Sequence, residues 1–343
     1  MTCPKCGKEL LIGSTLCPDC DVLEIPPKQK KKLSKRGKLI ILSFLSAILL
    51  SVTLWVISYV SGFGADGVQN ANALNMSCAE KIGNEFYFSD GDELFGIDGR
   101  FKNTELIDKG SDIYCLYNAD GELYYVKNKV LCKFSPKKRV KTEILKLNAE
   151  KEISVVGSSK KAIYYSFDDG IYLFDKETSQ IKPYCKGNAV IANNKLYVFS
   201  GGVAEKVDMS SGERVTICNI PQFDKPVFVK NNDIYVINYK EMKVYTINIK
   251  NGEREAVFNP ADYENISDVS KMNYCNGFFF FTGEDGIYKV NARSGKSELL
   301  GDTGYVNSIS IVDNKIFSRR YEGASYFSNM NGKILYKEEF DAE

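Results

Sequence analysis

Residues Ala162–Asp175 read AIYYSFDDGIYLFD, two short apolar segments joined by an Asp-Asp-Gly turn. Apolar and aromatic residues on both sides of a tight turn predict a β-hairpin. The pattern recurs through the C-terminal part of the chain, with an aromatic residue at the third position of each first segment. Seven residues mark the repeat in this way: Tyr87, Tyr124, Tyr164, Tyr197, Tyr235, Phe279 and Phe317.

The marks are separated by 37, 40, 33, 38, 44 and 38 residues. Several units end in a polar turn and a last apolar strand, as in MSSGERVTIC at Met209–Cys218. Each unit therefore holds about four strands, and a period of about 40 residues with four strands is typical of β-propeller blades. We predict an all-β fold with a seven-bladed β-propeller over residues 76–343. A ring of six or eight blades, a β-sandwich or two barrels are the alternatives.

Aromatic side chains are abundant, with 20 Phe and 21 Tyr. Most occupy strand positions that repeat from unit to unit, which favours packing between blades over a carbohydrate-stacking surface. Phe278–Phe281 is a run of four rings. Successive side chains of a strand point to opposite faces, so we expect two of the four to be partly exposed.

A second stretch, Leu39–Ser61, reads LIILSFLSAILLSVTLWVISYVS, 23 residues without a charge. A helix of this length covers roughly 34 Å, slightly more than the ~30 Å hydrocarbon core of a bilayer. We predict a transmembrane helix over 39–61. The alternatives are a buried core helix and a cleaved signal sequence, for which Ala71-Asn72-Ala73 resembles a cleavage site.

The flanks of this run differ in charge. Lys28–Lys38 contains seven Lys or Arg, whereas Gly62–Ala79 contains none. This asymmetry predicts a single-pass protein of the cell membrane with a cytoplasmic N-terminus and an extracytoplasmic C-terminal domain. The basic strip should also attract anionic lipid headgroups. Ser43, Ala47 and Ser51 recur at a spacing of four and offer a face for homodimerisation.

The first twenty residues contain two CxxC pairs, Cys3/Cys6 and Cys17/Cys20, separated by ten residues. Two such pairs supply the four thiolates of a tetrahedral zinc site. We predict a zinc ribbon in which Zn²⁺ is structural, because all four ligands come from the protein and no position is open. Gly7 should provide a left-handed position after the first pair. A pair of disulfides or a redox CxxC is the competing interpretation, which a reducing cytoplasm disfavours.

The predicted division of the chain is a zinc ribbon at 1–25, a basic juxtamembrane linker at 26–38, a transmembrane helix at 39–61, a flexible spacer at 62–75 and the propeller at 76–343.

Six further cysteines lie after the membrane run: Cys78, Cys115, Cys132, Cys185, Cys218 and Cys275. Only Cys78 and Cys115 occupy equivalent inner positions of neighbouring units, so they are the one disulfide pair that the repeat register allows. Cys185 and Cys218 should lie on outermost strands, too far apart to pair. We expect mostly free, buried thiols.

Charge and composition limit the kinds of binding and catalysis that the chain can perform. The 38 residues before the membrane run carry nine Lys or Arg against four Asp or Glu, while charges after it are scattered in both signs. No nucleic-acid-binding face is expected there. The chain has no histidine, which excludes Ser-His-Asp and Cys-His catalysis and His-ligated metals. We therefore do not expect an enzyme.

Taken together, the ribbon cysteines, the basic strip, the single apolar run and phrases such as IYYSFDDGIYLFD resemble the zinc-ribbon membrane proteins of low-GC Gram-positive bacteria. The outer part is similar to a propeller domain of unknown function related to low-density-lipoprotein-receptor-type β-propellers. The resemblance covers nearly the whole chain and implies its fold and topology but no activity. Asp21 departs from the ribbon pattern at the place that matches Gly7.

Two functions remain open from the sequence. The first is a non-catalytic membrane-anchored scaffold or sensor, whose propeller binds a protein, peptide or cell-wall ligand and whose ribbon contacts a cytoplasmic partner. The second is a surface enzyme that acts on wall polymer or glycan through propeller carboxylates.

Overall fold

The computed structural model describes residues 2–10, 17, 20, 46, 71–72, 76–146, 153–167, 170–192, 195–209, 211–259, 272–283, 285–302, 304–320 and 323–339. The chain divides into two units, residues 1–60 and 61–343. Within the described ranges, no helix is long and apolar enough to cross a membrane. The predicted transmembrane run at 39–61 lies outside those ranges, apart from Ser46.

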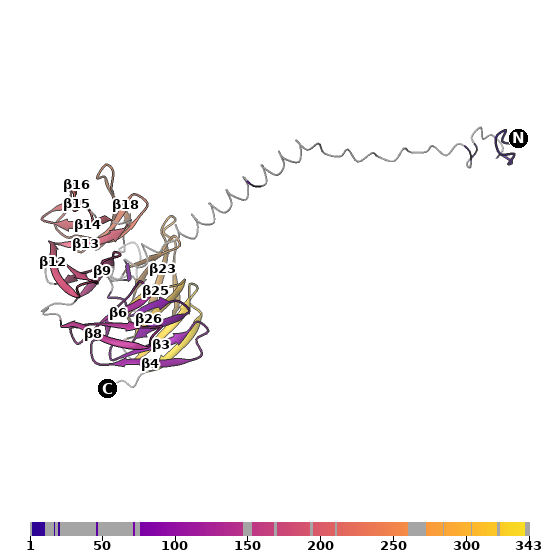
Figure 1. Ribbon diagram of the computed structural model, residues 1–343. Helices are drawn as coiled ribbons and strands as arrows, with labels where there is room; N and C mark the ends of the chain where they lie inside the picture. Colours follow the sequence, from indigo (N-terminus) through magenta and orange to yellow (C-terminus); the bar gives the residue numbers. More distant parts are fainter. Residues whose placement is uncertain are drawn as a thin grey trace. The chain divides into compact units, whose positions relative to one another are not determined.

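The second unit is a β-propeller of seven four-stranded antiparallel sheets, drawn as arrows in Figure 1. The strands of each sheet pair in chain order. Blades 1 to 3 comprise β1 (Ala79–Ile82), β2 (Glu85–Ser89), β3 (Glu93–Asp98), β4 (Thr104–Lys109); β5 (Tyr114–Ala119), β6 (Glu122–Lys127), β7 (Val130–Ser135), β8 (Val140–Lys146); and β9 (Ser154–Ser158), β10 (Ala162–Phe167), β11 (Gly170–Asp175), β12 (Gln180–Lys186).

The remaining four blades follow the same plan, which confirms the prediction of seven. They comprise β13 (Asn188–Ala192), β14 (Lys195–Ser200), β15 (Val203–Asp208), β16 (Arg214–Asn219); β17 (Asp224–Lys230), β18 (Asp233–Asn238), β19 (Lys243–Asn248), β20 (Arg254–Phe258); β21 (Asn273–Cys275), β22 (Phe278–Thr282), β23 (Gly286–Asn291), β24 (Ser297–Asp302); and β25 (Val306–Val312), β26 (Lys315–Arg320), β27 (Ala324–Asn329), β28 (Ile334–Glu339).

The first strand of every blade lies innermost. β1 contacts both β5 and β25, and β13 contacts both β9 and β17. The rings of Phe228 on β17 and Tyr274 on β21 have centroids 5.1 Å apart. The first strands therefore form a closed ring, and the fourth strands β4, β8, β12 and β16 lie along the periphery (Figure 1).

All seven repeat-marking aromatic residues lie on second strands, and six of them are buried, with Tyr235 half-buried. β2 shows why these strands are so apolar. Phe86 and Phe88 pack towards blade 7, while Tyr87 between them packs towards blade 2. Because each sheet lies between two others, both of its faces are buried and its middle strands lack the polar alternation of a half-exposed strand.

The same geometry corrects the prediction for the four-phenylalanine run. Phe279, Phe280 and Phe281 are fully buried, and only Phe278 is half-buried. Phe279 and Phe281 pack towards blade 5 and Phe280 towards blade 7. The expectation of two partly exposed rings was wrong because it assumed a sheet with one face in water.

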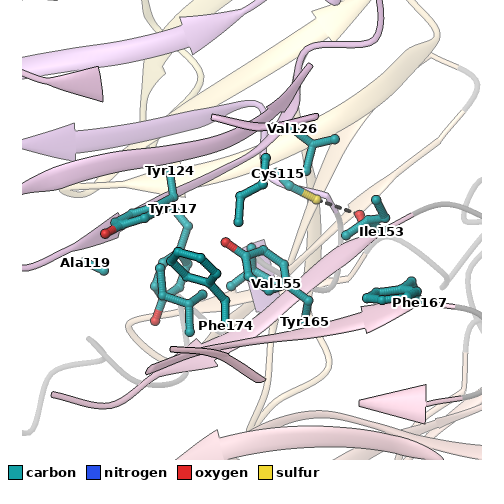
Figure 2. Close-up of a cluster of buried hydrophobic side chains, with 12 residues drawn as sticks. Cys115, Tyr117, Ala119, Tyr124, Val126, Ile153, Val155, Tyr165, Phe167 and Phe174 are labelled. Carbon is teal, nitrogen blue, oxygen red and sulfur yellow. Dashed lines mark hydrogen bonds between the residues drawn. The ribbon is translucent and has the colours of Figure 1, made fainter. Parts of the chain in front are cut away.

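Figure 2 shows one interface in detail, the cluster between blades 2 and 3. Tyr124 of blade 2 lies against Phe174 of blade 3, with ring centroids 6.4 Å apart. Cys115 donates its S–H to the carbonyl of Ile153 over 2.7 Å. The hydroxyl of Tyr165 is enclosed in this cluster and has no hydrogen-bond partner among the described residues.

Blade 1 and blade 7 share no strand at the ring closure, because each of these blades is built from consecutive strands. Phe327 lies 5.5 Å from both Phe86 and Phe88, measured between ring centroids. Lys81 forms an ion pair with Asp313 at 2.6 Å. Hydrogen bonds from the Cys78 N–H to Ser310 Oγ at 3.2 Å and from Arg319 Nη1 to the carbonyl of Asp90 at 2.8 Å also join the two blades. The closure therefore combines buried aromatic area with hydrogen bonds and an exposed ion pair.

The segment before β1 also contributes to closure. Ala71 and Asn72, which lie in the stretch predicted as a spacer, are buried in the propeller. The Asn72 side chain donates to the carbonyl of Ile311 at 2.6 Å and accepts its N–H at 2.8 Å. An asparagine amide thus satisfies both backbone groups of an inner-strand residue of blade 7.

Every described hydrophobic cluster draws its residues from 71–339. The propeller thus contains its own core and all of its strands. A unit with a complete core and contiguous sheets folds independently of the rest of the chain.

Candidate functional site

The first candidate site is the group of four N-terminal cysteines. The N–H of Gly7 donates to the carbonyl of Cys3 over 2.9 Å, and the N–H of Cys3 donates to the carbonyl of Lys8 over 2.8 Å. Gly7 has φ of +74°, which confirms the left-handed position predicted from the sequence. Thr2 and Glu9 pair as an antiparallel bridge that closes this turn. Asp21 lies outside the described residues.

The two CxxC pairs come together, as predicted. The Sγ atoms of Cys3, Cys6, Cys17 and Cys20 all lie within 4.8 Å of one another, and none forms a disulfide. Cys6 Sγ and Cys17 Sγ are 3.7 Å apart. Four thiolates at about 2.3 Å from a tetrahedral zinc would lie about 3.8 Å from each other, so the donor set and its spacing fit Zn²⁺.

Hydrogen bonds within the cluster separate the pKa values of its thiols. The backbone N–H groups of Cys6 and Lys5 lower the pKa of Cys3 to about 7. The thiol–thiol hydrogen bond with Cys6 raises the pKa of Cys20 to about 12. A bound dication favours all four thiolates, so metal binding should release protons and weaken as the pH falls.

The propeller cysteines provide a contrast. All six are free, which agrees with the expectation of free thiols and shows that Cys78 and Cys115 form no disulfide. Four are buried, while Cys185 on β12 and Cys218 on β16 are half-buried. Burial raises the pKa of Cys132 and of Cys275 to about 11. Burial thus favours the protonated form of these two thiols, which is a poor nucleophile.

The second candidate site is a cleft of about 420 Å³ in the propeller. It lies where the turn between β14 and β15 meets the link between β16 and β17, and its lining includes Gly201, Gly202, Pro221 and Gln222. The N–H of Ile220 donates to the carbonyl of Gly202 over 2.8 Å and fixes the two segments together. Phe223, next to the lining residues, is 46% exposed.

Glycines with positive φ lie at and beside the rim of this cleft. Gly201 and Gly202 have φ of +60° and +81°. Gly187, just before β13, has φ of +104°, and a Cβ there would lie 2.4 Å from the carbonyl oxygen of Phe199. A larger residue at 187 would displace Phe199, which lines the cleft.

A buried acidic side chain, Asp224, lines the cleft. Both oxygens of Asp224 accept from Arg254, Oδ2 from Nε at 2.8 Å and Oδ1 from Nη2 at 3.0 Å. Asn238 Nδ2 also donates to Oδ1 at 2.6 Å. The carboxylate is fully buried, and the guanidinium stacks on the ring of Tyr245 at 3.3 Å. A paired, hydrogen-bonded carboxylate of this kind holds this part of the lining in place.

Sequence comparison finds no matching protein-family model and no matching curated relative. Solved structures share the fold. One is PorZ, described as an essential bacterial surface component of the type-IX secretion system of Porphyromonas gingivalis, with a TM-score of 0.56 at 13% identity. The match covers 77% of this chain and 38% of the PorZ chain, so the present chain spans less than half the length of PorZ.

Two further structures are more distant. BamB from Moraxella catarrhalis has a TM-score of 0.47 at 12% identity, over 71% of this chain and 79% of BamB. An oligogalacturonate lyase in complex with manganese has a TM-score of 0.44 at 11% identity, over 62% and 72% of the two chains. At 13% identity the match to PorZ shows a shared fold alone, and it assigns no site.

The cleft was not predicted from the sequence. Gly201-Gly202 and Pro221 are visible there as turn residues. What the sequence does not reveal is that the turn after β14 and the segment after β16 meet, because the pairing of β15 with β16 that brings them together is not visible in it.

Proposed function

We propose that the chain is a non-catalytic, membrane-anchored binding protein that acts as a scaffold or sensor, with its propeller outside the cell and its cysteine cluster in the cytoplasm. One observation carries the proposal: a thiol cluster suited to zinc and a self-contained propeller flank a 23-residue run without a charge. An anchor between two separately folded modules allows each to meet its own partner.

The N-terminal module would be a structural zinc ribbon, with Cys3, Cys6, Cys17 and Cys20 as ligands. So short a segment has little core of its own, so metal binding would supply most of its folding free energy. Its role would be to present a fixed surface to a cytoplasmic protein.

The propeller would bind a protein, a peptide or a cell-wall ligand. The cleft supports this role, since its volume falls within the usual range of about 300–1,000 Å³ for ligand sites. Gln222 and the backbone of Gly201 and Gly202 offer hydrogen-bonding groups, and exposed Phe223 offers a ring beside them. Polar groups next to an aromatic surface recognise ligands by orientation as well as by area.

Crosslinking in intact cells tests the proposal, with full-length protein compared with a version that ends at Asn75. We expect partners that are captured only when the propeller is present. Identical partners for both versions would contradict a propeller that binds proteins. The binding of purified wall fragments would then be compared between the unaltered propeller and the cleft variant Gly202→Val.

A second experiment separates a binding protein from an enzyme. Each exposed acidic residue of the propeller is replaced singly, and function is scored in cells. A binding protein should tolerate every single replacement, whereas one or two indispensable carboxylates would overturn the non-catalytic assignment.

A further inference from the structure

The turns at the two faces of the propeller differ sharply in charge. Because each blade is an antiparallel meander, its first and third turns lie at one face of the ring, and its second turn and the link to the next blade lie at the other. The first and third turns of the seven blades contain twelve Lys or Arg and five Asp or Glu. We call this side the basic face.

The turns and links at the opposite face have the opposite sign. Their described residues include two Lys, Lys129 and Lys240, against five acidic residues: Asp90, Asp92, Asp112, Glu241 and Asp285. The cleft, whose lining includes Gly202 and Gln222, opens on this side. Surfaces that serve only solubility mix both signs, so this segregation needs another explanation.

The cations of the basic face are available to a partner. Eleven of the twelve are exposed, and Lys176 is half-buried. Lys176 pairs with Asp120, and Arg139 pairs with Glu85 and Glu105. The other ten form no ion pair with any described residue: Arg100, Lys102, Lys137, Lys138, Lys160, Lys161, Lys250, Arg293, Lys296 and Lys333.

Most of this charge follows an arc over neighbouring blades. Blades 6, 7, 1, 2 and 3 contribute eleven of the twelve cations and three of the five acidic residues. The turns are short, with two to five residues each, so nothing protrudes between them. A low face with cations spread over five blades suits a planar anionic partner better than a single small anion.

Apolar side chains accompany the cations. Val140 directly follows Arg139 and is 52% exposed, and Ile334 directly follows Lys333 and is 49% exposed. Cations beside exposed aliphatic groups match the headgroup region of an anionic bilayer, where phosphates and acyl chains meet.

We infer that the basic face of the propeller docks on an anionic lipid bilayer. The inference deepens the proposed function, since it orients the propeller at the membrane to which residues 39–61 would anchor it. In this orientation the opposite face and its cleft point away from the bilayer and remain open to a ligand.

Vesicle flotation tests the inference with residues 62–343, which contain the whole propeller and lack the apolar run. We expect binding to vesicles that contain phosphatidylglycerol, loss of binding at high salt, and little binding to phosphatidylcholine alone. Lys137→Gln with Lys138→Gln should weaken binding about thirtyfold, from the contribution of each Lys near an anionic surface. Lys129→Gln with Lys240→Gln, the matched change on the other face, should leave it within twofold.

Three results would overturn the inference: no binding to anionic vesicles at low salt, equal binding to both lipid compositions, or equal loss in the two double variants. Binding to soluble polyphosphate without binding to vesicles would assign the face to a soluble polyanion and likewise exclude the bilayer. Carbonate extraction of the full chain tests the anchor separately, because the fragment lacks residues 39–61.

Discussion

The cysteine cluster and the propeller are stabilised in different ways. In the cluster, Cys3 and Cys17 are buried, and the four sulfur atoms converge on one point. In the propeller, each blade packs buried aromatic or aliphatic side chains against both neighbours. The stability of the first module would therefore depend on the zinc ion that we propose there, whereas that of the second is spread over many contacts.

The largest expected effect follows from the ion. Cys3→Ser or a strong zinc chelator should unfold residues 1–20 and leave the propeller folded, because structural zinc contributes about 10–16 kcal/mol of apparent binding free energy in such modules. Bound zinc and the thermal unfolding of the propeller are measured together.

Cys218→Ser is the matched control, since it removes a half-buried propeller thiol. It should keep full zinc content. Stoichiometric zinc in Cys3→Ser would refute the four-thiolate site.

Ring closure is the next place to test the propeller. Phe327→Ala removes a fully buried ring that contacts Phe86, Phe88 and Phe317, and should cost about 3–5 kcal/mol of unfolding free energy. Urea unfolding measures the loss. Phe223→Ala, the same change at an exposed ring, should cost less than about 1 kcal/mol. Equal losses would show that closure does not depend on this cluster.

The Asn72 contact should have a smaller effect. Asn72→Ala leaves the buried N–H and C=O of Ile311 without their partners and should cost about 1–3 kcal/mol. Asn331→Ala at an exposed turn serves as the control. If the two variants unfold at the same urea concentration, residues before β1 do not stabilise the ring.

The smallest effect concerns pH. Desolvation raises the pKa of Glu80 from 4.5 to about 7, although its carboxylate accepts the N–H groups of Lys81 and Asn118. The folded state then binds the proton more tightly than the unfolded state, so stability should fall as the pH rises from about 4.5 to 7, by less than about 3 kcal/mol. Glu80→Gln should flatten this part of the urea-midpoint profile. If the urea midpoint of Glu80→Gln depends on pH as steeply as that of the parent protein, another group causes the pH dependence.

The sequence predicted the features that repeat or that depend on neighbouring residues. The aromatic marks recur with one period, so Tyr87 and Phe317 could be assigned to equivalent strands. Gly7 follows its CxxC pair directly, and the turn it forms is local.

Features that depend on how distant segments pack, within a blade or between blades, were missed. The burial of Phe280 required knowing that both faces of its sheet are covered. The cleft required knowing that Gly202 and Gln222 meet. The charge difference between the two faces became visible only when every turn could be assigned to one end of the ring.

The central claim is that the two modules lie on opposite sides of a membrane. Intact cells expressing the full chain with an epitope tag at each end would be treated with a protease that does not cross membranes. We predict loss of the C-terminal tag and protection of the N-terminal tag until the cells are lysed. Protection of both tags, or loss of both without lysis, would contradict the account.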